Sequence, residues 1–233
     1  MLIYLIFMIP PLILMLYAQY KVNSTFKKYS QVASSSRITG AEAAQRLLRA
    51  NGLDNVRLES VKGKLSDHYD PRKKVLRLST DVGNSHSVAA LGVVAHEVGH
   101  AMQDKVGYFF LKFRNSIVPA ANLGSKLGYI FIIGGLILYA AVQLDLGLTV
   151  AYVGVALFFL AVIFALITLP VEFNASKRAR AMLASSGLVS GGVEANGASA
   201  VLSAAALTYV AALLQALGQL FYFIYLIMGA RRR

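Results

Sequence analysis

Long apolar stretches with almost no charge dominate this sequence and restrict the folds open to it. The first three run from Leu2 to Tyr20, from Leu127 to Leu144 and from Leu146 to Leu169. A helix that crosses a bilayer needs about 20 apolar residues, so each stretch has the length of a membrane span. Only 15% of the residues are charged, against about 25% in soluble domains. This composition excludes a disordered chain and argues against a water-soluble protein.

The first stretch could instead be a cleaved signal peptide. No basic residue precedes it, and its apolar core is too long for a signal. We therefore predict a transmembrane helix over residues 1–20, which Pro10 and Pro11 would kink. Only a short loop around Asp145 separates the second stretch from the third, so residues 118–169 are predicted to form a transmembrane hairpin.

A fourth apolar stretch, from Leu202 to Met228, is interrupted by serine, threonine and glutamine. Its alanine-rich first part predicts a helix packed on protein, which ends a segment over residues 170–210. Its later part is short for a full span. The C-terminal helix, residues 211–233, is therefore predicted to cross the membrane, to re-enter it or to lie along its surface.

Basic residues indicate how the chain is oriented. The segment 21–126 holds 17 of the 23 lysines and arginines, whereas the hairpin tip holds one aspartate and no basic residue. The positive-inside rule therefore places residues 21–126 in the cytoplasm. The formal net charge of +12 is interpreted as contact with anionic lipid headgroups, and not as nucleic-acid binding.

Residues 21–117 have the composition of a folded aqueous domain. Thr39 and Glu42 match a capping box, which predicts a helix over residues 41–50. The other elements predicted here are strands at Val56–Val61 and Lys74–Thr80, a turn at Asp67–Arg72 and a helix at Ser85–Gln103. The expected fold class is thus an α-helical multi-pass membrane protein with a small α+β domain. The sequence has no cysteine, which excludes disulfides and thiolate metal sites.

The last of these helices carries the motif His96-Glu97-Val-Gly-His100. Histidines four residues apart lie on one face of a helix, where both rings can bind one zinc ion. In zinc hydrolases with this motif, the glutamate after the first histidine is the base that takes a proton from water. Two alternative interpretations assign no catalytic or metal-binding role to the histidines. They would lie on a solvated face of the helix, or in the core with satisfied hydrogen bonds.

A catalytic zinc needs a third protein ligand and an open position. His86 is predicted on the same helix as the motif and cannot fold back onto the metal, while His68 lies in a turn that is typical of a surface. Glu172 is the best carboxylate, because a charge at the end of a membrane helix is costly without a partner. The predicted hairpin would return it to the side of His100.

The alternative for Glu172 is a surface ion pair with Lys177 or Arg178, at the start of an exposed helix.

Three segments resemble the YugP-like bacterial membrane zinc metallopeptidases, and the similarity covers nearly the whole chain. The segments are Ser85–Gln103 around the motif, Leu169–Ser176 around Glu172, and residues 206–212 around Tyr209. The resemblance implies that His96, His100 and Glu172 bind zinc and that Glu97 is the base. It also implies a zincin-like domain and a bacterial cytoplasmic membrane location.

The layout is also similar to that of the HtpX-like membrane proteases, in which a transmembrane hairpin separates the motif helix from a glutamate ligand. Those proteases usually have an aspartate four residues after the ligand, where this chain has Ser176, with Asn174 nearby. Hydrogen-bonding support for a histidine ligand would then come from different groups.

The expected reaction is hydrolysis of a peptide or membrane-protein substrate. Tyr209 could donate a hydrogen bond to the developing oxyanion, although a core or interfacial tyrosine is the simpler interpretation. The substrate is expected to add as an extended strand beside Lys74–Thr80, unless that strand is plain sheet core.

Two other functions stay open at this point. One is an intramembrane protease, with the motif helix in lipid and Asp145 as the third ligand. The other is a non-catalytic scaffold or chaperone with a structural zinc site, although such sites favour four protein ligands. The sequence predicts no oligomeric state.

Overall fold

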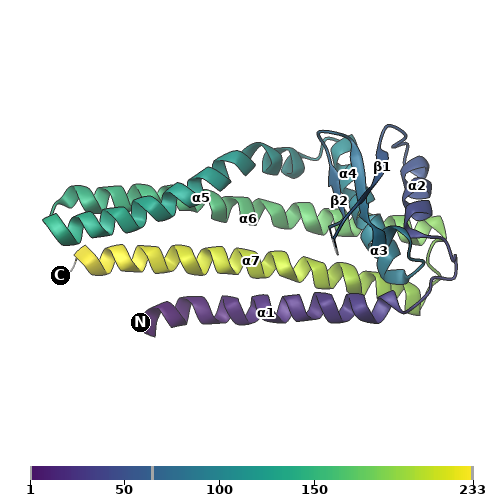
Figure 1. Cartoon of the computed structure of the whole chain (residues 1–233), viewed down its shortest axis with the longest axis horizontal. Helices are drawn as coiled ribbons and strands as arrows, with labels where there is room; N and C mark the ends of the chain where they lie inside the picture. Colours follow the sequence, from purple (N-terminus) through teal and green to yellow (C-terminus); the bar gives the residue numbers. More distant parts are fainter. Residues whose placement is uncertain (1, 64–65, 232–233) are drawn as a thin grey trace. The chain divides into compact units, whose positions relative to one another are not determined.

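A computed structural model describes residues 2–63 and 66–231 (Figure 1). They form two compact units. The helical unit contains residues 2–17, 113–169 and 208–231, and the mixed unit contains residues 18–112 and 170–207. Met1, Lys64, Leu65, Arg232 and Arg233 belong to segments predicted above but lie outside the described residues.

Four long helices are apolar enough to cross a membrane. They are α1 (Leu2–Ser30), α5 (Phe109–Val142), α6 (Asp145–Ser186) and α7 (Val193–Arg231). This confirms a mainly helical protein with several candidate spans. The boundaries predicted at 169/170 and 210/211 fall inside α6 and α7, because both helices continue without a break from one unit into the other.

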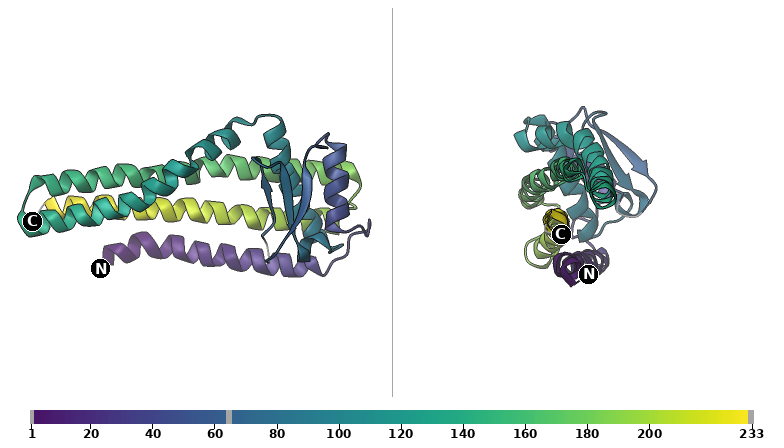
Figure 2. Two further views of the ribbon diagram at one scale, coloured as in Figure 1. Left: turned by 45° about the horizontal axis from the view of Figure 1, so that its top comes forward. Right: turned by 90° about the vertical axis from the view of Figure 1, so that its left-hand side faces the viewer.

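In the helical unit, α5 and α6 run side by side in close contact (Figures 1 and 2). A Cβ atom added at Gly135 would lie 2.5 Å from the backbone nitrogen of Ala151, and one at Gly154 would lie 2.6 Å from that of Ile132. Small residues let membrane helices approach to backbone contact. The rings of Tyr129, Phe158 and Phe223 add edge-to-face contacts, with centroids 5.1–5.4 Å apart.

Gly135→Ala is expected to destabilise this helix pair, because the new methyl group must push the α6 backbone away. Overpacking of this kind costs about 1–3 kcal/mol. The neighbouring Gly134 is the matched control, since a Cβ there meets no atom within 4 Å. Thermal unfolding of the purified chain in detergent should show a lower Tm for Gly135→Ala only; equal Tm values for the two variants would contradict the close contact.

The mixed unit contains a three-stranded sheet of β1 (Arg57–Val61), β2 (His68–Asp70) and β3 (Val75–Ser79), which lies beside α2 (Figure 2). The strand order is β1-β3-β2, with β1 parallel and β2 antiparallel to β3. The segment predicted as a turn at Asp67–Arg72 therefore contains a strand.

The expectation that a substrate strand adds beside Lys74–Thr80 is wrong, and the alternative of a strand in the sheet core is correct. Both of its edges are hydrogen-bonded to other strands, so no substrate strand can pair with it. Its sequence explains this position, because Val75, Leu76 and Leu78 are all buried, and a strand covered on both faces needs consecutive apolar residues.

The helices of the mixed unit begin at well-formed caps. The capping box predicted at Thr39 and Glu42 is confirmed, and α2 runs from Gly40 to Ala50. A short helix, α3 (Thr80–Gly83), precedes α4 (Val88–Lys105). The Ser87 hydroxyl accepts a hydrogen bond from the Ala90 amide at the start of α4. The helix thus begins three residues later than predicted, and His86 lies outside it.

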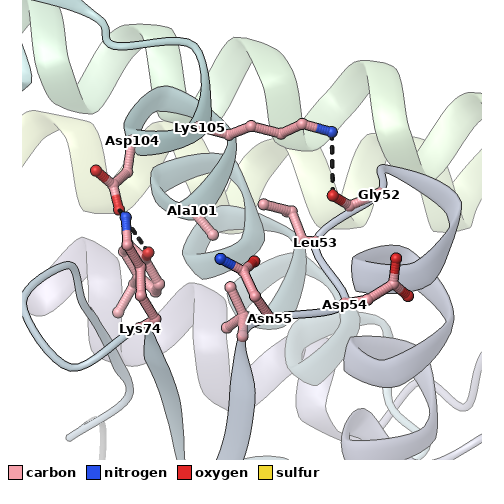
Figure 3. A pocket seen from close by; sticks show the side chains of 10 residues that line it. Gly52, Leu53, Asp54, Asn55, Lys74, Ala101, Asp104 and Lys105 are labelled. Atoms are coloured by element: carbon pink, nitrogen blue, oxygen red, sulfur yellow. Dashed lines mark hydrogen bonds and ion pairs between the residues drawn. The ribbon is translucent and has the colours of Figure 1, made fainter.

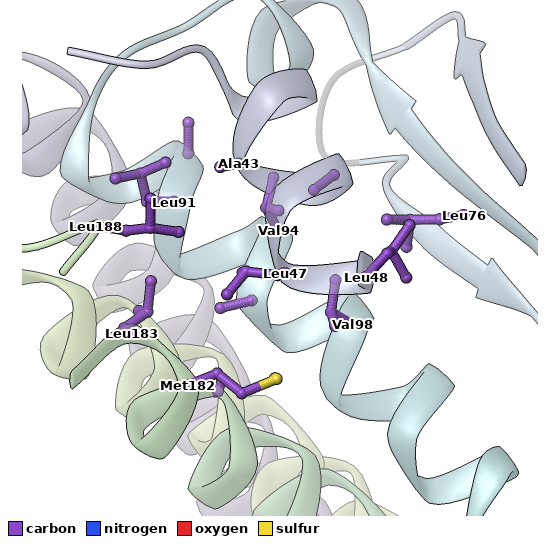
Figure 4. Packing of buried hydrophobic residues seen from close by; sticks show 14 of the residues in the cluster. Ala43, Leu47, Leu48, Leu76, Leu91, Val94, Val98, Met182, Leu183 and Leu188 are labelled. Carbon is purple, nitrogen blue, oxygen red and sulfur yellow. The ribbon is translucent and has the colours of Figure 1, made fainter. Parts of the chain in front are cut away.

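Helix α4 is the centre of the mixed unit. Leu91, Val94 and Val98 are fully buried in a cluster with Leu47 of α2 (Figure 4). The same cluster takes in residues from the end of α6 and the start of α7, namely Ala179, Met182, Leu183, Ala198 and Leu202. Protein therefore surrounds the motif helix, and α4 is not among the four candidate spans of the described chain.

Candidate metal centre

His96, His100 and Glu172 come together in the mixed unit. The Nε2 atom of His96 lies 3.2 Å from Oε2 of Glu172, and Nε2 of His100 lies 3.5 Å from the same oxygen. Among the described residues, these three form the one group of histidine and acidic side chains with ligand atoms all within 4.8 Å. Glu172 is buried and both histidines are half-buried.

These separations suit zinc. Zinc takes imidazole nitrogen and carboxylate oxygen at about 2.0–2.2 Å in a tetrahedral arrangement, so that two ligand atoms lie about 3.3–3.6 Å apart. The distance from His100 to Glu172 lies within this range, and the distance from His96 to Glu172 lies just below it. Three protein ligands would leave one tetrahedral position open, as in catalytic zinc sites.

The other nitrogen of each ring is held by a buried side chain. The His100 Nδ1–H donates to Oε1 of Gln103 at 3.0 Å, and the Ser176 hydroxyl lies 3.3 Å from Nδ1 of His96. Histidine metal ligands are usually oriented in this way through the nitrogen that faces away from the metal. In this chain, hydrogen-bonding support for the two histidines thus comes from Gln103 and Ser176 and not from an aspartate.

A glycine in the motif allows the ligands to meet. A Cβ atom at Gly99 would lie 2.7 Å from the carbonyl oxygen of Ala175, so only glycine lets α6 approach α4 this closely. Gly99 is next to His100 on α4, and Ala175 is three residues after Glu172 on α6. The packing of two backbones therefore sets the distance between ligands that are 72 residues apart in the chain (172 − 100).

Glu97 is held by a strand that the sequence did not reveal. Its Oε2 accepts a hydrogen bond from the Tyr69 amide of β2 at 3.0 Å. Burial raises the pKa of the Glu97 carboxyl to about 7, and the charges of Glu172 and Asp67 act in the same direction. A carboxyl with this pKa exchanges its proton near neutral pH, as a general acid–base group must.

Tyr69 also borders a polar pocket of about 510 Å³ on the mixed unit (Figure 3). Its hydroxyl donates to Asp104 at 2.6 Å, and Lys74 pairs with the same carboxylate. Lys105 donates to the Gly52 carbonyl on the opposite wall. Through its backbone and its side chain, Tyr69 thus connects the pocket to Glu97.

The remaining candidates lie elsewhere. His68 is exposed on β2, where its Nδ1 lies 2.8 Å from the Ser66 carbonyl, and His86 is exposed before α4. Asp145 begins α6 and is not in the ligand group of the described chain. Tyr209 is a half-buried residue of α7 and belongs to the helical unit. Arg178, named above as an alternative ion-pair partner of Glu172, donates a hydrogen bond to Oδ1 of Asn174 at 2.9 Å.

Comparison with known proteins identifies the family to which this chain belongs. The model of a family described as "Putative neutral zinc metallopeptidase" matches residues 4–228. The chain belongs to this family. It is also similar to a protein of Bacillus subtilis (strain 168) named "Putative membrane protease YugP", with 46% identity over 215 residues, which are 92% of each chain. No solved structure matches the chain.

Membership of this zinc metallopeptidase family confirms the resemblance inferred from the sequence. The match spans all the residues discussed here, from Gly52 to Tyr209. It also agrees with the four apolar helices, since the Bacillus protein is named a membrane protease.

Proposed function

We propose that this protein is a membrane-embedded zinc endopeptidase. The observation that carries the proposal is the convergence of two imidazole nitrogens and one carboxylate oxygen beside Glu97, in a member of a zinc metallopeptidase family. His96, His100 and Glu172 would hold the ion. Zinc supplies a Lewis acid that polarises a peptide carbonyl and makes a water molecule acidic at neutral pH.

Glu97 moves the proton in this proposal. Its carboxylate takes a proton from the attacking water and later delivers it to the amine nitrogen of the leaving peptide. The Tyr69 amide holds Oε2 and thereby limits the orientations of the carboxylate.

The proposal places the mixed unit at the cytoplasmic face of a bacterial cytoplasmic membrane. Basic residues concentrate in the segment 21–126, and the positive-inside rule assigns such segments to the cytoplasm. With 42 residues, α6 is about twice the length that a bilayer requires, so it can cross the membrane and still extend beyond it. The mixed unit would form a zincin-like domain there.

The substrate is proposed to be a peptide or a membrane protein bound near β2, since β3 has no free edge. β2 is an edge strand of the sheet, and its Tyr69 contacts Glu97 directly. Basic residues outside the sheet would contact anionic headgroups.

Removal of zinc tests the proposed function directly. The purified full-length chain in detergent is incubated with a peptide library, and cleavage is followed by mass spectrometry. We expect a chelator to reduce cleavage to background in step with the measured zinc content, and added zinc to restore it. Undiminished cleavage by zinc-free protein would contradict the proposal, as would a zinc-loaded chain that cleaves none of the peptides.

A further inference from the structure

We propose that Gln103 is a positioning residue that sets both His100 and Glu172 for metal binding. The inference rests on the proposed function, because it assumes that these two side chains are ligands. Gln103 comes three residues after His100 on α4, and its side chain is fully buried. Each end of its amide contacts a different part of the candidate metal centre.

The oxygen end of the amide acts on His100. An amide oxygen can only accept, so the 3.0 Å contact requires the proton of the His100 ring to be on Nδ1. In the neutral ring Nε2 is then unprotonated, and it presents its lone pair on the side where Glu172 Oε2 lies, 3.5 Å away. Gln103 thus selects the tautomer that can bind a metal.

The nitrogen end acts on the segment that carries Glu172. It donates to the Val171 carbonyl at 2.7 Å and to Oδ1 of Asn174 at 3.0 Å. These residues lie on either side of Glu172 in α6. Arg178 also donates to Oδ1 of Asn174, which fixes the amide that Gln103 contacts. One side chain therefore joins α4 to the turn of α6 that supplies the third ligand.

The two supporting contacts of the centre are not equivalent. Ser176 contacts His96 at 3.3 Å and comes from the same helix as Glu172. Gln103 makes the shorter contact, and it bonds both to His100 on its own helix and to the part of α6 around Glu172. A hydroxyl can donate or accept, so Ser176 leaves the tautomer of His96 open, whereas Gln103 fixes that of His100.

Zinc affinity distinguishes positioning from a merely structural role. Gln103→Met keeps the length of the side chain but removes the acceptor and the donors. We expect the zinc affinity of the purified full-length chain, measured by competition with a chromophoric chelator, to fall about 10–100-fold. The matched control is Leu91→Ala, which creates a cavity in the same helix away from the ligands and should lower Tm without changing zinc affinity.

A second variant keeps the test decisive if Gln103→Met folds poorly. Gln103→Glu retains an oxygen that can face His100 but loses the donors to Val171 and Asn174. We expect it to bind zinc more tightly than Gln103→Met and less tightly than the native chain. The absorption spectrum of Co²⁺ bound in place of zinc should change in both variants, because it reports the ligand arrangement.

The outcomes separate this inference from the proposed function. His96→Ala is measured in parallel as a ligand variant. Weak zinc binding by His96→Ala together with native affinity for both Gln103 variants would overturn the positioning role alone. Native zinc affinity in His96→Ala would overturn the metal centre itself. A loss of affinity in Leu91→Ala equal to that in Gln103→Met would show that Gln103 acts only through stability.

Discussion

Replacement of Glu97 by glutamine is expected to lower peptide hydrolysis about 10²–10⁴-fold, the range that general acid–base groups contribute. Glutamine has nearly the same shape and can still accept the Tyr69 amide hydrogen bond, but it cannot take a proton from water. Because Glu97 is not in the ligand group, zinc should stay bound. Metal analysis and peptide cleavage on the same preparation measure the two properties together.

Glu59→Gln is the matched control for this loss of activity. Glu59 lies on β1 and pairs with Arg77 at 3.0 Å, and its side chain is 42% exposed. An exposed ion pair contributes about 0–1 kcal/mol, so the control should cleave peptides at the native rate. Native cleavage by Glu97→Gln would remove the assigned base, and loss of zinc from that variant would make Glu97 a ligand. Retained zinc with lost cleavage would favour an enzyme over a zinc-containing scaffold.

Removal of the third ligand is expected to have the largest effect on metal binding. Glu172→Ala deletes the oxygen that both histidines approach and leaves two protein ligands. The loss of zinc affinity should exceed the 10–100-fold typical of changes in groups that only support a ligand. Chelator competition gives the affinity, and elemental analysis gives the zinc content per chain.

Glu194→Ala controls for loss of a carboxylate that accepts backbone hydrogen bonds and is not a ligand. The Glu194 carboxylate accepts from the Ser35 and Ser190 amides and so ties a loop to the start of α7. Its removal should lower stability and leave zinc affinity unchanged. Unchanged zinc stoichiometry and affinity in Glu172→Ala would remove the third-ligand assignment.

Strong local signals account for the features that the sequence predicts well. The apolar stretches predicted membrane helices, and the four candidate spans agree with them. The capping box fixed the start of α2 within a residue. The motif spacing put His96 and His100 on one helix face, and the proximity of Glu172 was expected from the returning hairpin. Whether these residues bind zinc stays a prediction.

Features that depend on contacts distant in sequence were missed. β2 has three residues, in a segment whose turn-forming residues predicted no strand. Its hydrogen bonds to β3 stabilise it as a strand. The bond from the Tyr69 amide to Glu97 leaves no trace in the sequence, because a backbone donor is present at almost every position. Gln103 did carry a signal, since a residue three after His100 lies on the same helix face.

Pro170 gave a misleading signal. The apolar stretch ends there, and proline often stops a helix, yet α6 continues to Ser186. Proline removes one backbone hydrogen bond, and neighbouring groups in a membrane protein can compensate for that loss. The continuation matters for the candidate centre, because it carries Glu172 and Ser176 on the same helix as the predicted span.

The order of the ligands along the chain has a consequence for biosynthesis. His96 and His100 are translated before α5, whereas Glu172 follows the apolar part of α6. A nascent chain that stops before α6 holds two of the three ligands, and only the finished polypeptide can unite them. Under the proposed function, the newly made chain would therefore be inactive until the hairpin and the segment that carries Glu172 have been synthesised.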